Sequence, residues 1–296
     1  MSKAYRFVTL DVFTGTRFGG NQLAVFPNAQ GISDAEMQSL AAEFNLSETT
    51  FVLPPADAAN TARVRIFNRV SEMPFAGHPN VGTGFVLADW ARGGLLKFEE
   101  IAGLVEVRVE RDAAGAATGT TIAAPQPLQL GREMPAALVA GCVGLPEDAV
   151  LTAAHQPVLA SVGNSFVIAE VTSEALSRAA PDLGRFRAAH QGYPDAGPNR
   201  LPLYLYAHSG AGTVRARMFS PLSGTVEDAA TGSAATPLAA LLLSLTSAES
   251  GAWDVTQGVE MRRPSLLRTT ARRSPQGILA TVGGSCVMVF EGTVRL

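Results

Sequence analysis

The sequence predicts an α+β protein made of two similar domains, each a curled, mostly antiparallel sheet around a buried helix. The first observation is length, because 296 residues exceed the usual size of one domain. The second is a recurring order of elements, in which an arginine-rich strand leads through a polar loop into a helix. The third is the composition of those two helices, which are small or apolar on nearly every side, as buried helices are.

The first half opens with four recognisable elements. Residues 4–13 form a strand-like stretch, followed by the glycine-containing loop TGTRFGGN and the apolar run LAVF. Ser33 and Glu36 have the spacing of a capping box, so a helix is expected from Ser33 to about Asn45. The β-branched segment TTFVL follows as a strand. Glu48 therefore stands between the end of a helix and the beginning of a strand.

The rest of the first half continues with strands and one helix. Residues 62–69, ARVRIFNR, alternate apolar and charged side chains as a half-exposed strand does. The loop SEMPFAGHP then leads into a helix with Pro79 in its first turn, running through VGTGFVLADW. Gly93-Gly94 ends that unit. Two further strands, LLKFEEI and VEVRVER, are expected to join around Ala102-Gly103.

The second half repeats this order. The segment SFVIAEV at 165–171 echoes TTFVL, and RARMF at 215–219 echoes RVRIF at 63–67. The loop VEDAATGSA then leads into the helix ATGSAATPLAALLL. An Ala-rich chain also produces chance echoes, but the shared order of strand, loop and buried helix favours an internal duplication.

Composition and charge exclude several classes of partner. A net charge of −3 gives no basic surface for nucleic acid or for an anionic membrane. Asp11 interrupts the N-terminal apolar segment, and the longest apolar run, near 233–245, is too short to span a bilayer, so we expect a cytoplasmic protein. Cys142 and Cys286 lie in no CxxC motif and beside no histidine, which predicts buried small side chains rather than a disulfide or a thiolate metal site.

The common cofactor and metal motifs are missing from the sequence. There is no GxxxxGK[ST], GxSxG or HExxH, and the four histidines lack metal-ligand spacing: His78, His155, His190 and His208. The stretch Gly210-Ala211-Gly212 follows a strand but has no third glycine, so a hairpin turn is favoured over a dinucleotide-binding loop. We therefore expect neither a metal nor a cofactor.

The candidate site residues lie in the two loops that lead into the buried helices. AGHP contains Gly77 and His78, and VEDAATGSA contains Asp228, Gly232 and Ser233. The free N–H groups and positive dipole of each helix start suit a carboxylate or a developing oxyanion, and two such ends facing one another would hold a small anionic substrate. Structural alternatives are a helix-capping Asp228, an N-cap His78 and a helix-start hydroxyl at Ser233.

At these residues the sequence resembles the PhzF family, the phenazine-biosynthesis isomerases and their relatives, which share the diaminopimelate epimerase fold. The matching segments run in order over nearly the whole chain: DVFTGTRFGGNQLAVF, NLSETTFV, EMPFAGHPNVGTG, RMFSPLSGTVEDAATGSA, QGVEMRRPS and VGGSCVMVFEGTVRL. The resemblance implies two similar domains with the active site in the cleft between them, and a homodimer. It also implies that the last strand returns to the first domain, which places the domains at 1–125 with about 281–296, and at 126–280.

Carried over residue by residue, the resemblance assigns roles to the candidates. Glu48, in the SETTF motif, is implied to be the proton-transferring group, with His78 and Asp228 as the other catalytic residues. Gly77 and Ser233 match the positions that hold the substrate carboxylate. Gly232, which precedes Ser233, is assigned to the same substrate-binding group.

Three departures from the pattern bear on the chemistry. Gln22 and Ala229 stand where the family has proline, and neither change removes an acid or a base, so loop rigidity is the property affected. In the more distant diaminopimelate epimerases and proline racemases, a cysteine precedes each buried helix. The corresponding residues here are expected to be Ala76 and Ala230, so racemisation by two thiols is disfavoured and a single-carboxyl mechanism is favoured.

The expected function is cofactor-independent isomerisation of a small unsaturated or cyclic carboxylic acid, with Glu48 as general acid and base. The resemblance implies trans-2,3-dihydro-3-hydroxyanthranilate as the first substrate to test. Burial against apolar neighbours such as Phe51 would raise the pKa of Glu48 from roughly 4.3. Two alternatives stay open: an amino-acid racemase or epimerase with Asp228 as the second acid or base, and a non-catalytic small-molecule-binding protein of the same fold.

Overall fold

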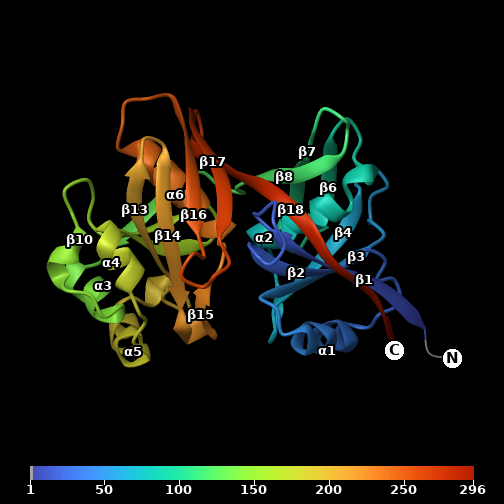
Figure 1. Cartoon of the computed structure of the whole chain (residues 1–296), viewed down its shortest axis with the longest axis horizontal. Coiled ribbons are helices and arrows are strands. Elements are labelled where there is room, and N and C mark those ends of the chain that lie inside the picture. Colours follow the sequence, from blue (N-terminus) through green and yellow to red (C-terminus); the bar gives the residue numbers. More distant parts are fainter. Residues whose placement is uncertain (1–2) are drawn as a thin grey trace. The chain divides into compact units, whose positions relative to one another are not determined.

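The computed structural model describes residues 3–296, which divide into two units. Unit 1 contains the chain up to Ala123 together with Gly283–Leu296, and unit 2 contains Ala124–Val282. The long strand β18 (Gly277–Arg295) begins in unit 2 and ends in unit 1, where it pairs antiparallel with β1 (Ala4–Val12) (Figure 1). Each unit therefore has its own strands and helices, and β18 contributes residues to both.

Strands are the main regular structure of unit 1. Its strands after β1 are β2 (Asn21–Phe26), β3 (Glu48–Leu53), β4 (Ala62–Phe67), β5 (Glu72–Met73), β6 (Leu95–Glu100), β7 (Gly103–Arg111) and β8 (Ala117–Ala123). Its helices are α1 (Asp34–Phe44), α2 (Gly77–Val86) and the short 3-10 turn Ala88–Trp90. The pairs β2–β3 and β4–β6 are parallel, whereas β1–β2, β3–β4, β4–β5, β6–β7 and β7–β8 are antiparallel. The sheet is therefore mixed.

Unit 2 has more helix. Its strands before β18 are β9 (Gln129–Glu133), β10 (Val150–Leu151), β11 (Val158–Ser161), β12 (Ser165–Val171), β13 (Leu203–Gly210), β14 (Thr213–Ser220), β15 (Thr225–Asp228), β16 (Ser250–Gln257) and β17 (Ser265–Ser274). Its helices are α3 (Ala136–Cys142), α4 (Ser173–Arg178), α5 (Leu183–Gly192) and α6 (Gly232–Ser244), with 3-10 turns at Glu147–Ala149, Pro194–Ala196 and Pro221–Ser223. Its parallel pairs are β12–β13 and β14–β16.

The two units share one order of strand pairing. In unit 1, β2 runs parallel to β3, β3 pairs antiparallel with β4, and β4 pairs with both β5 and parallel β6. In unit 2 the strands β12 to β16 repeat these relations in the same order. RVRIF and RARMF thus occupy matching strands, β4 and β14. The echo of TTFVL by SFVIAEV was misassigned, because SFVIAEV forms β12, the counterpart of β2, and the counterpart of β3 is β13.

An arginine–glutamate pair repeats with the strands. Arg65 of β4 donates two hydrogen bonds of 2.7 Å to the carboxylate of Glu72 in β5. Arg217 of β14 donates bonds of 2.8 and 2.9 Å to Glu227 in β15. Each guanidinium also lies over the ring of the phenylalanine two residues further along its strand, at 5.1 and 4.8 Å. Each pair fixes the short strand that leads into α2 or α6.

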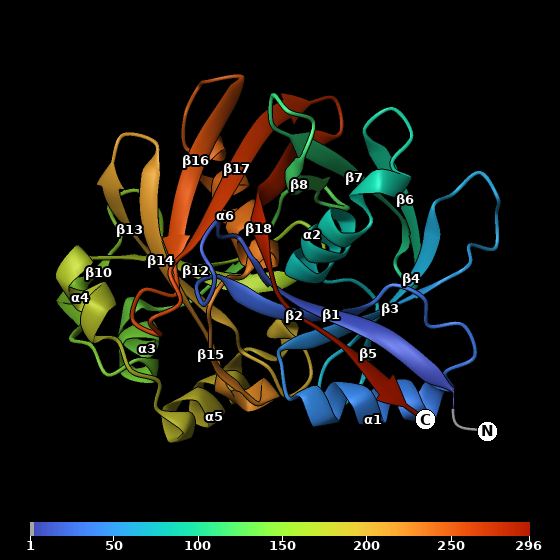
Figure 2. The same cartoon turned by 45° about the vertical axis from the view of Figure 1, so that its right-hand side comes forward.

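Helix α2 is buried over most of its length. Eight of its ten residues are buried, and it contacts β1, β2, β3, β7 and β8 (Figure 2). Its glycines permit this contact, since a Cβ at Gly82 would lie 2.5 Å from Leu23 and one at Gly84 would lie 2.5 Å from Val107. In unit 2, α6 has eleven of thirteen residues buried and contacts β11, β12, β16 and β17. The small or apolar composition of both helices matches this burial.

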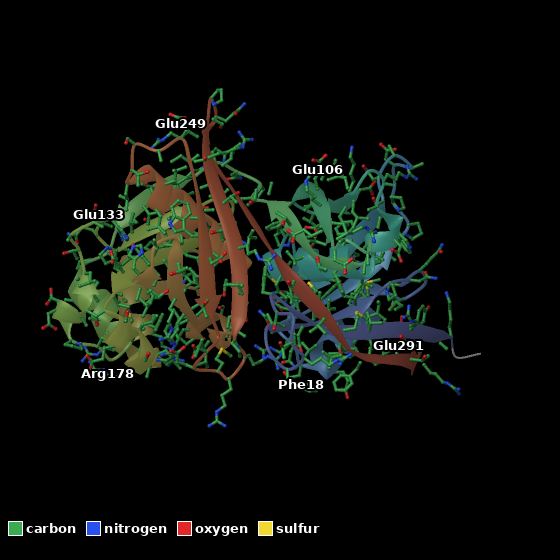
Figure 3. All side chains as sticks on the ribbon, turned by 45° about the horizontal axis from the view of Figure 1, so that its top comes forward. Phe18, Glu106, Glu133, Arg178, Glu249 and Glu291 are labelled. Atoms are coloured by element: carbon green, nitrogen blue, oxygen red, sulfur yellow. The ribbon has the colours of Figure 1, made fainter. Side chains whose placement is uncertain are left out.

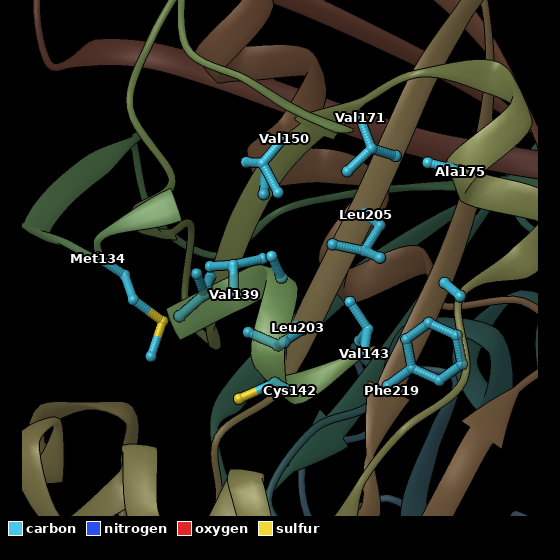
Figure 4. Packing of buried hydrophobic residues seen from close by; sticks show 14 of the residues in the cluster. Met134, Val139, Cys142, Val143, Val150, Val171, Ala175, Leu203, Leu205 and Phe219 are labelled. Atoms are coloured by element: carbon cyan, nitrogen blue, oxygen red, sulfur yellow. The ribbon is translucent and has the colours of Figure 1, made fainter. Parts of the chain in front are cut away.

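A second core lies on the other side of each set of strands. In unit 2, residues of β12 to β14 such as Leu203, Leu205 and Phe219 pack with residues of α3 such as Val139 and Cys142 (Figure 4). In unit 1 the corresponding cluster is aromatic and packs against α1. Cys142 is buried in the unit 2 cluster, which confirms the expectation from sequence, and burial raises the pKa of its thiol to about 12.

Two local predictions are confirmed by hydrogen bonds. Ser33 caps α1 through the Glu36 backbone, the Glu36 carboxylate bonds the Ser33 backbone at 2.8 Å, and Asn45 ends the helix with a left-handed φ of 53°. The Gly210–Thr213 segment turns between the antiparallel strands β13 and β14. No helix within residues 3–296 combines the length and the apolar character that a membrane span requires.

Candidate active site

Glu48 and His78 form the central contact of the candidate site in unit 1. Glu48 is the first residue of β3, and His78 is the second residue of α2. Their Oε2 and Nε2 atoms are 3.2 Å apart, with 16% and 6% of the two side chains exposed. The parallel β2–β3 register aligns Leu23 with Glu48, so Glu48 lies at the same end of the sheet as Asn21, the first residue of β2. The structure therefore brings together two predicted site residues from distant segments.

Strand alternation decides what surrounds Glu48. Glu48 and Thr50 point to the face that packs on α2, where the Thr50 hydroxyl lies 2.8 Å from that of Thr83. Phe51 points to the opposite face, where its ring stacks on Phe26 at 4.9 Å. The expectation that Phe51 buries Glu48 was therefore wrong, because residues an odd number of positions apart in a strand face opposite sides of the sheet. The α2 side of the sheet shields the carboxyl instead.

His78 is neutral at pH 7. Burial lowers the pKa of its imidazole to about 3, and a hydrogen bond with the Gln22 backbone opposes only part of that shift. The contact with Glu48 is therefore between a carboxyl group and a neutral imidazole, not an ion pair. On the other side of the ring, Nδ1 lies 3.4 Å from the amide nitrogen of Asn21, whose oxygen lies 3.4 Å from the Ser47 hydroxyl.

The loop before Asn21 holds an unusual backbone conformation. Phe13 and Phe18 both have left-handed φ values, 65° and 71°, although neither is glycine. The Phe18 N–H donates a 2.7 Å hydrogen bond to the buried carboxylate of Asp11, while the Phe18 ring is 66% exposed (Figure 3). Asp11 therefore stabilises the loop that places Asn21 beside His78.

Neither α2 nor α6 has a side-chain cap. The N-cap residues are Ala76 and Thr231, neither side chain bonds the first turn, and neither first turn contains an acid. In α1, by contrast, Ser33 and two acids compensate the positive end. Two of the capping alternatives are therefore wrong: Asp228 ends β15 and does not cap α6, and His78 does not cap α2. The starts of α2 and α6 are suited to binding an anion.

The residue before α6 is Thr231 and not Ala230. The expectation of Ala76 and Ala230 at the two positions before the helices is thus wrong by one residue in unit 2. The sequence pattern alone did not fix where α6 begins. Because Thr231 also lacks a thiol, the argument against a two-cysteine mechanism is unchanged. Gly232 and Ser233 are the first two residues of α6, with Gly232 buried and Ser233 half-buried.

Asp228 belongs to a buried polar network in unit 2. It is 8% exposed, and the Thr231 hydroxyl donates a 2.6 Å hydrogen bond to its Oδ2 atom. The Gln257 amide donates to the Asp228 backbone oxygen at 2.8 Å. Sequence reasoning missed both partners. Gln257 stands in the matched segment QGVEMRRPS and Thr231 in the matched segment VEDAATGSA, and these matches were the available signals.

Glu100 was also missed. It ends β6, and both of its carboxyl oxygens are buried. Burial raises the pKa of Glu100 to about 8, although the nearby amide of Asn80 lowers it in part. No hydrogen bond of normal geometry within residues 3–296 reaches either oxygen or the Asn80 Oδ1 atom, while Asn80 Nδ2 donates to Ala76 at 3.0 Å. A buried carboxylic acid therefore lies beside the first turns of α2.

Glu100→Gln is expected to stabilise the protein at pH 8 and to have little effect at pH 5. The folded-state pKa lies above that of the unfolded chain, so the stability contributed by Glu100 falls as pH rises from about 4.5 to about 8. Glutamine does not titrate, and its amide can donate to Asn80. The gain in unfolding free energy at pH 8 should be on the order of 4 kcal/mol, measured by urea denaturation at both pH values.

The neighbouring Glu99 gives an opposite-sign control. Its carboxylate accepts hydrogen bonds from the backbone N–H groups of Ala56 and Asp57 and from the Asn60 amide, which lower its pKa. Glu99→Gln should therefore destabilise the protein at pH 8. Equal effects of the two substitutions, or a Glu100→Gln gain that does not depend on pH, would refute the assignment of a buried protonated Glu100.

Metal ligands do not gather anywhere in the described chain. Among residues 3–296, no group of three or more His, Cys, Asp or Glu side chains is arranged to hold a metal ion. The candidate residues instead lie separately in the two units: a carboxyl–imidazole pair and an uncapped helix start in unit 1, and a hydrogen-bonded carboxyl and an uncapped helix start in unit 2. This set can move protons and bind an anion.

Solved structures show the class of fold. A PhzF family protein from Bacillus anthracis matches with a TM-score of 0.86 at 22% identity, covering 99% of this chain and 100% of that one. A hydroxyproline epimerase from Agrobacterium vitis matches with a TM-score of 0.63 at 13% identity, covering 99% and 93%. The chain thus has the fold of the PhzF and proline racemase-like proteins, in which a mixed sheet forms a barrel.

Sequence relatives define the family. The model described as "Phenazine biosynthesis-like protein" matches residues 10–292. A protein named trans-2,3-dihydro-3-hydroxyanthranilate isomerase, from Pseudomonas fluorescens, is 35% identical over 99% of this chain and 100% of its own length. An uncharacterized isomerase from Mesorhizobium japonicum is 35% identical over 97% of each chain. The chain belongs to the phenazine biosynthesis-like (PhzF) family and is an isomerase, which confirms the resemblance read from the motifs.

Proposed function

We propose that this isomerase moves a proton within a small unsaturated or cyclic carboxylic acid, with Glu48 as the group that carries the proton. The observation behind the proposal is the contact between Glu48 and His78, an acid beside a neutral imidazole in a largely buried setting. The names of relatives from two Pseudomonas species supply the substrate class and the first compound to test, trans-2,3-dihydro-3-hydroxyanthranilate. No step of the proposal calls on a metal or an organic cofactor.

In the proposed reaction, Glu48 begins as a carboxylate and removes a proton from an activated carbon of the substrate. The electron pair of the broken C–H bond enters the conjugated system. The protonated Glu48 then returns the proton to another carbon on the same face, so the product is a double-bond isomer and no proton is gained or lost overall. A positioned acid or base of this kind contributes on the order of 100- to 10,000-fold in rate.

His78 is proposed to orient Glu48. With Asn21 beside Nδ1, the imidazole places Nε2 3.2 Å from the Glu48 Oε2 atom, and substrate binding would bring the two atoms into a hydrogen bond. This contact would hold one carboxyl oxygen and leave Oε1 to meet the substrate. Because the buried imidazole carries no charge, its contact with Glu48 is not an ion pair.

The remaining predicted residues are proposed to bind the substrate. The uncapped starts of α2 and α6, with Gly77, Gly232 and Ser233, would hold its carboxylate through backbone N–H groups and the Ser233 hydroxyl. Asp228 would accept hydrogen bonds from an amino or hydroxyl group and stabilise charge as the double bonds shift. Support comes from the missing side-chain caps and from the motif match at these positions.

We also propose that units 1 and 2 are similar domains, each with its sheet curled around one central helix. The repeated pairing order of β2 to β6 and β12 to β16 supports this proposal, as does the repeated arginine–glutamate pair before α2 and before α6. The burial of both helices against several strands also supports it.

Turnover in deuterated water tests the proposed function. The protein is incubated with trans-2,3-dihydro-3-hydroxyanthranilate and a panel of small cyclic and unsaturated carboxylic acids, and products are followed by proton NMR. The expected result is a double-bond isomer, which carries a solvent deuteron to the extent that the proton held by Glu48 exchanges with solvent before it returns to carbon. Inversion at a carbon next to the carboxyl group would instead show a racemase or epimerase. Binding without conversion across the panel, detected by thermal shift, would show a small-molecule-binding protein.

A further inference from the structure

The side-chain amide of Gln257 has a single possible orientation. Gln257 ends β16 and is 1% exposed. Its Nε2 atom donates to the Asp228 backbone oxygen at 2.8 Å and to the Thr231 hydroxyl at 3.0 Å. Its Oε1 atom accepts from the Thr231 backbone N–H at 3.2 Å and from the Tyr204 hydroxyl at 3.0 Å. Since a backbone oxygen only accepts and a backbone N–H only donates, the positions of Nε2 and Oε1 are fixed.

This orientation fixes the direction of the hydrogen bonds that follow it. Because Gln257 donates to the Thr231 oxygen, the Thr231 hydroxyl hydrogen is available for Asp228, whose Oδ2 lies 2.6 Å away. At the other end, burial and the charge of Asp228 hold the pKa of Tyr204 well above its usual range, so Tyr204 stays a donor. The bonds therefore run in one direction from Tyr204 through Gln257 and Thr231 to Asp228.

We propose that Thr231, Gln257 and Tyr204 are positioning residues that keep Asp228 ionised and in one rotamer. A short hydrogen bond to a charged oxygen is stronger than one between neutral groups, and donors arranged in series strengthen each other. This series of hydrogen bonds from Tyr204 through Gln257 and Thr231, called the relay below, thus favours the carboxylate form of Asp228 over its protonated form. This inference rests on the proposed function, in which Asp228 accepts hydrogen bonds from the substrate.

Replacing Thr231 separates this role from a purely structural one. Thr231→Val keeps the shape of the side chain and removes the donor, whereas Thr231→Ser keeps the donor. The free protein is labelled with ¹³C at aspartate carboxyls, and Asp228→Asn assigns the Asp228 resonance. Thr231→Val is expected to raise the pH midpoint of that resonance by about one to two units, and Thr231→Ser to restore it towards the wild-type midpoint.

Two further variants complete the test. Tyr204→Phe removes only the hydroxyl donor at the far end of the relay from Asp228, so it should raise the pH midpoint of the Asp228 resonance by a smaller amount. The proposal therefore stays testable if Thr231→Val fails to fold. Thr236 is a matched control, because it is a buried threonine of α6 that donates to Gly232 and not to Asp228. Thr236→Val should leave the midpoint unchanged.

The outcomes distinguish this inference from the proposed function. An unchanged midpoint in Thr231→Val and Tyr204→Phe, with a lowered melting temperature, would overturn the relay and leave a structural network. The midpoint is measured without substrate, so a shifted midpoint in a protein that converts no substrate would support the relay and count against the isomerase proposal. Where turnover exists, the acid side of the kcat/KM profile should move with the midpoint.

Discussion

Glu48→Gln is expected to lower kcat/KM by a factor of about 100 to 10,000 and to leave the fold intact. Glutamine keeps the size of the side chain and can still meet His78 Nε2, which lies 3.2 Å from Oε2. It cannot take a proton from carbon. The loss should fall mainly on kcat, because the proposed carboxylate-binding groups belong to the starts of α2 and α6 and are unchanged. Steady-state kinetics and deuterium incorporation measure the effect.

An exposed glutamate of the same unit provides the control for this prediction. Glu43 lies on the outer face of α1, so Glu43→Gln should retain wild-type kinetics. Thermal melting of both variants separates lost chemistry from lost structure. If Glu48→Gln retains both turnover and solvent-deuterium exchange, Glu48 does not carry the proton and the mechanism proposed here is wrong.

Local features of the fold could be predicted from the sequence because they depend on neighbouring residues. The helix from Ser33 to Asn45 follows from one capping box and one helical periodicity, and the structure contains both hydrogen bonds of that box. The turn at Gly210 follows from two glycine residues between strand-like runs. The identities of Glu48, His78 and Asp228 as candidates came from the family motifs and not from periodicity.

The features that sequence reasoning missed depend on contacts between distant segments. The role given to Phe51 was wrong because of strand alternation, but the packing of the Glu48 face of β3 on α2 is a contact between distant segments. Gln257 meets Asp228 only because β16 pairs with β14, a relation that no local pattern encodes. Glu100 has an ordinary sequence context, and only its burial beside Asn80 makes it unusual.

Arg217→Met is expected to lower the free energy of unfolding by about 3–5 kcal/mol. Arg217 is buried and donates two hydrogen bonds to Glu227, and it also donates to the backbone oxygens of Leu176 and Ala179 at 2.9 and 2.7 Å. Methionine fills most of the space but leaves a largely buried carboxylate and two carbonyl groups without these donors. Urea denaturation measures the loss.

A second substitution tests why Arg217→Met destabilises. If the cost comes from the uncompensated carboxylate, adding Glu227→Gln to Arg217→Met should recover part of the lost stability, although Glu227→Gln alone destabilises. The exposed pair of Arg6 and Glu291, at 3.0 Å with more than half of each side chain exposed, is the matched control, and Arg6→Ala should cost less than about 1 kcal/mol. A loss of unfolding free energy in Arg217→Met no larger than in Arg6→Ala would mean that the arginine–glutamate pair does not stabilise the β14–β15 hairpin. The repeated pair would then be weaker support for two similar domains.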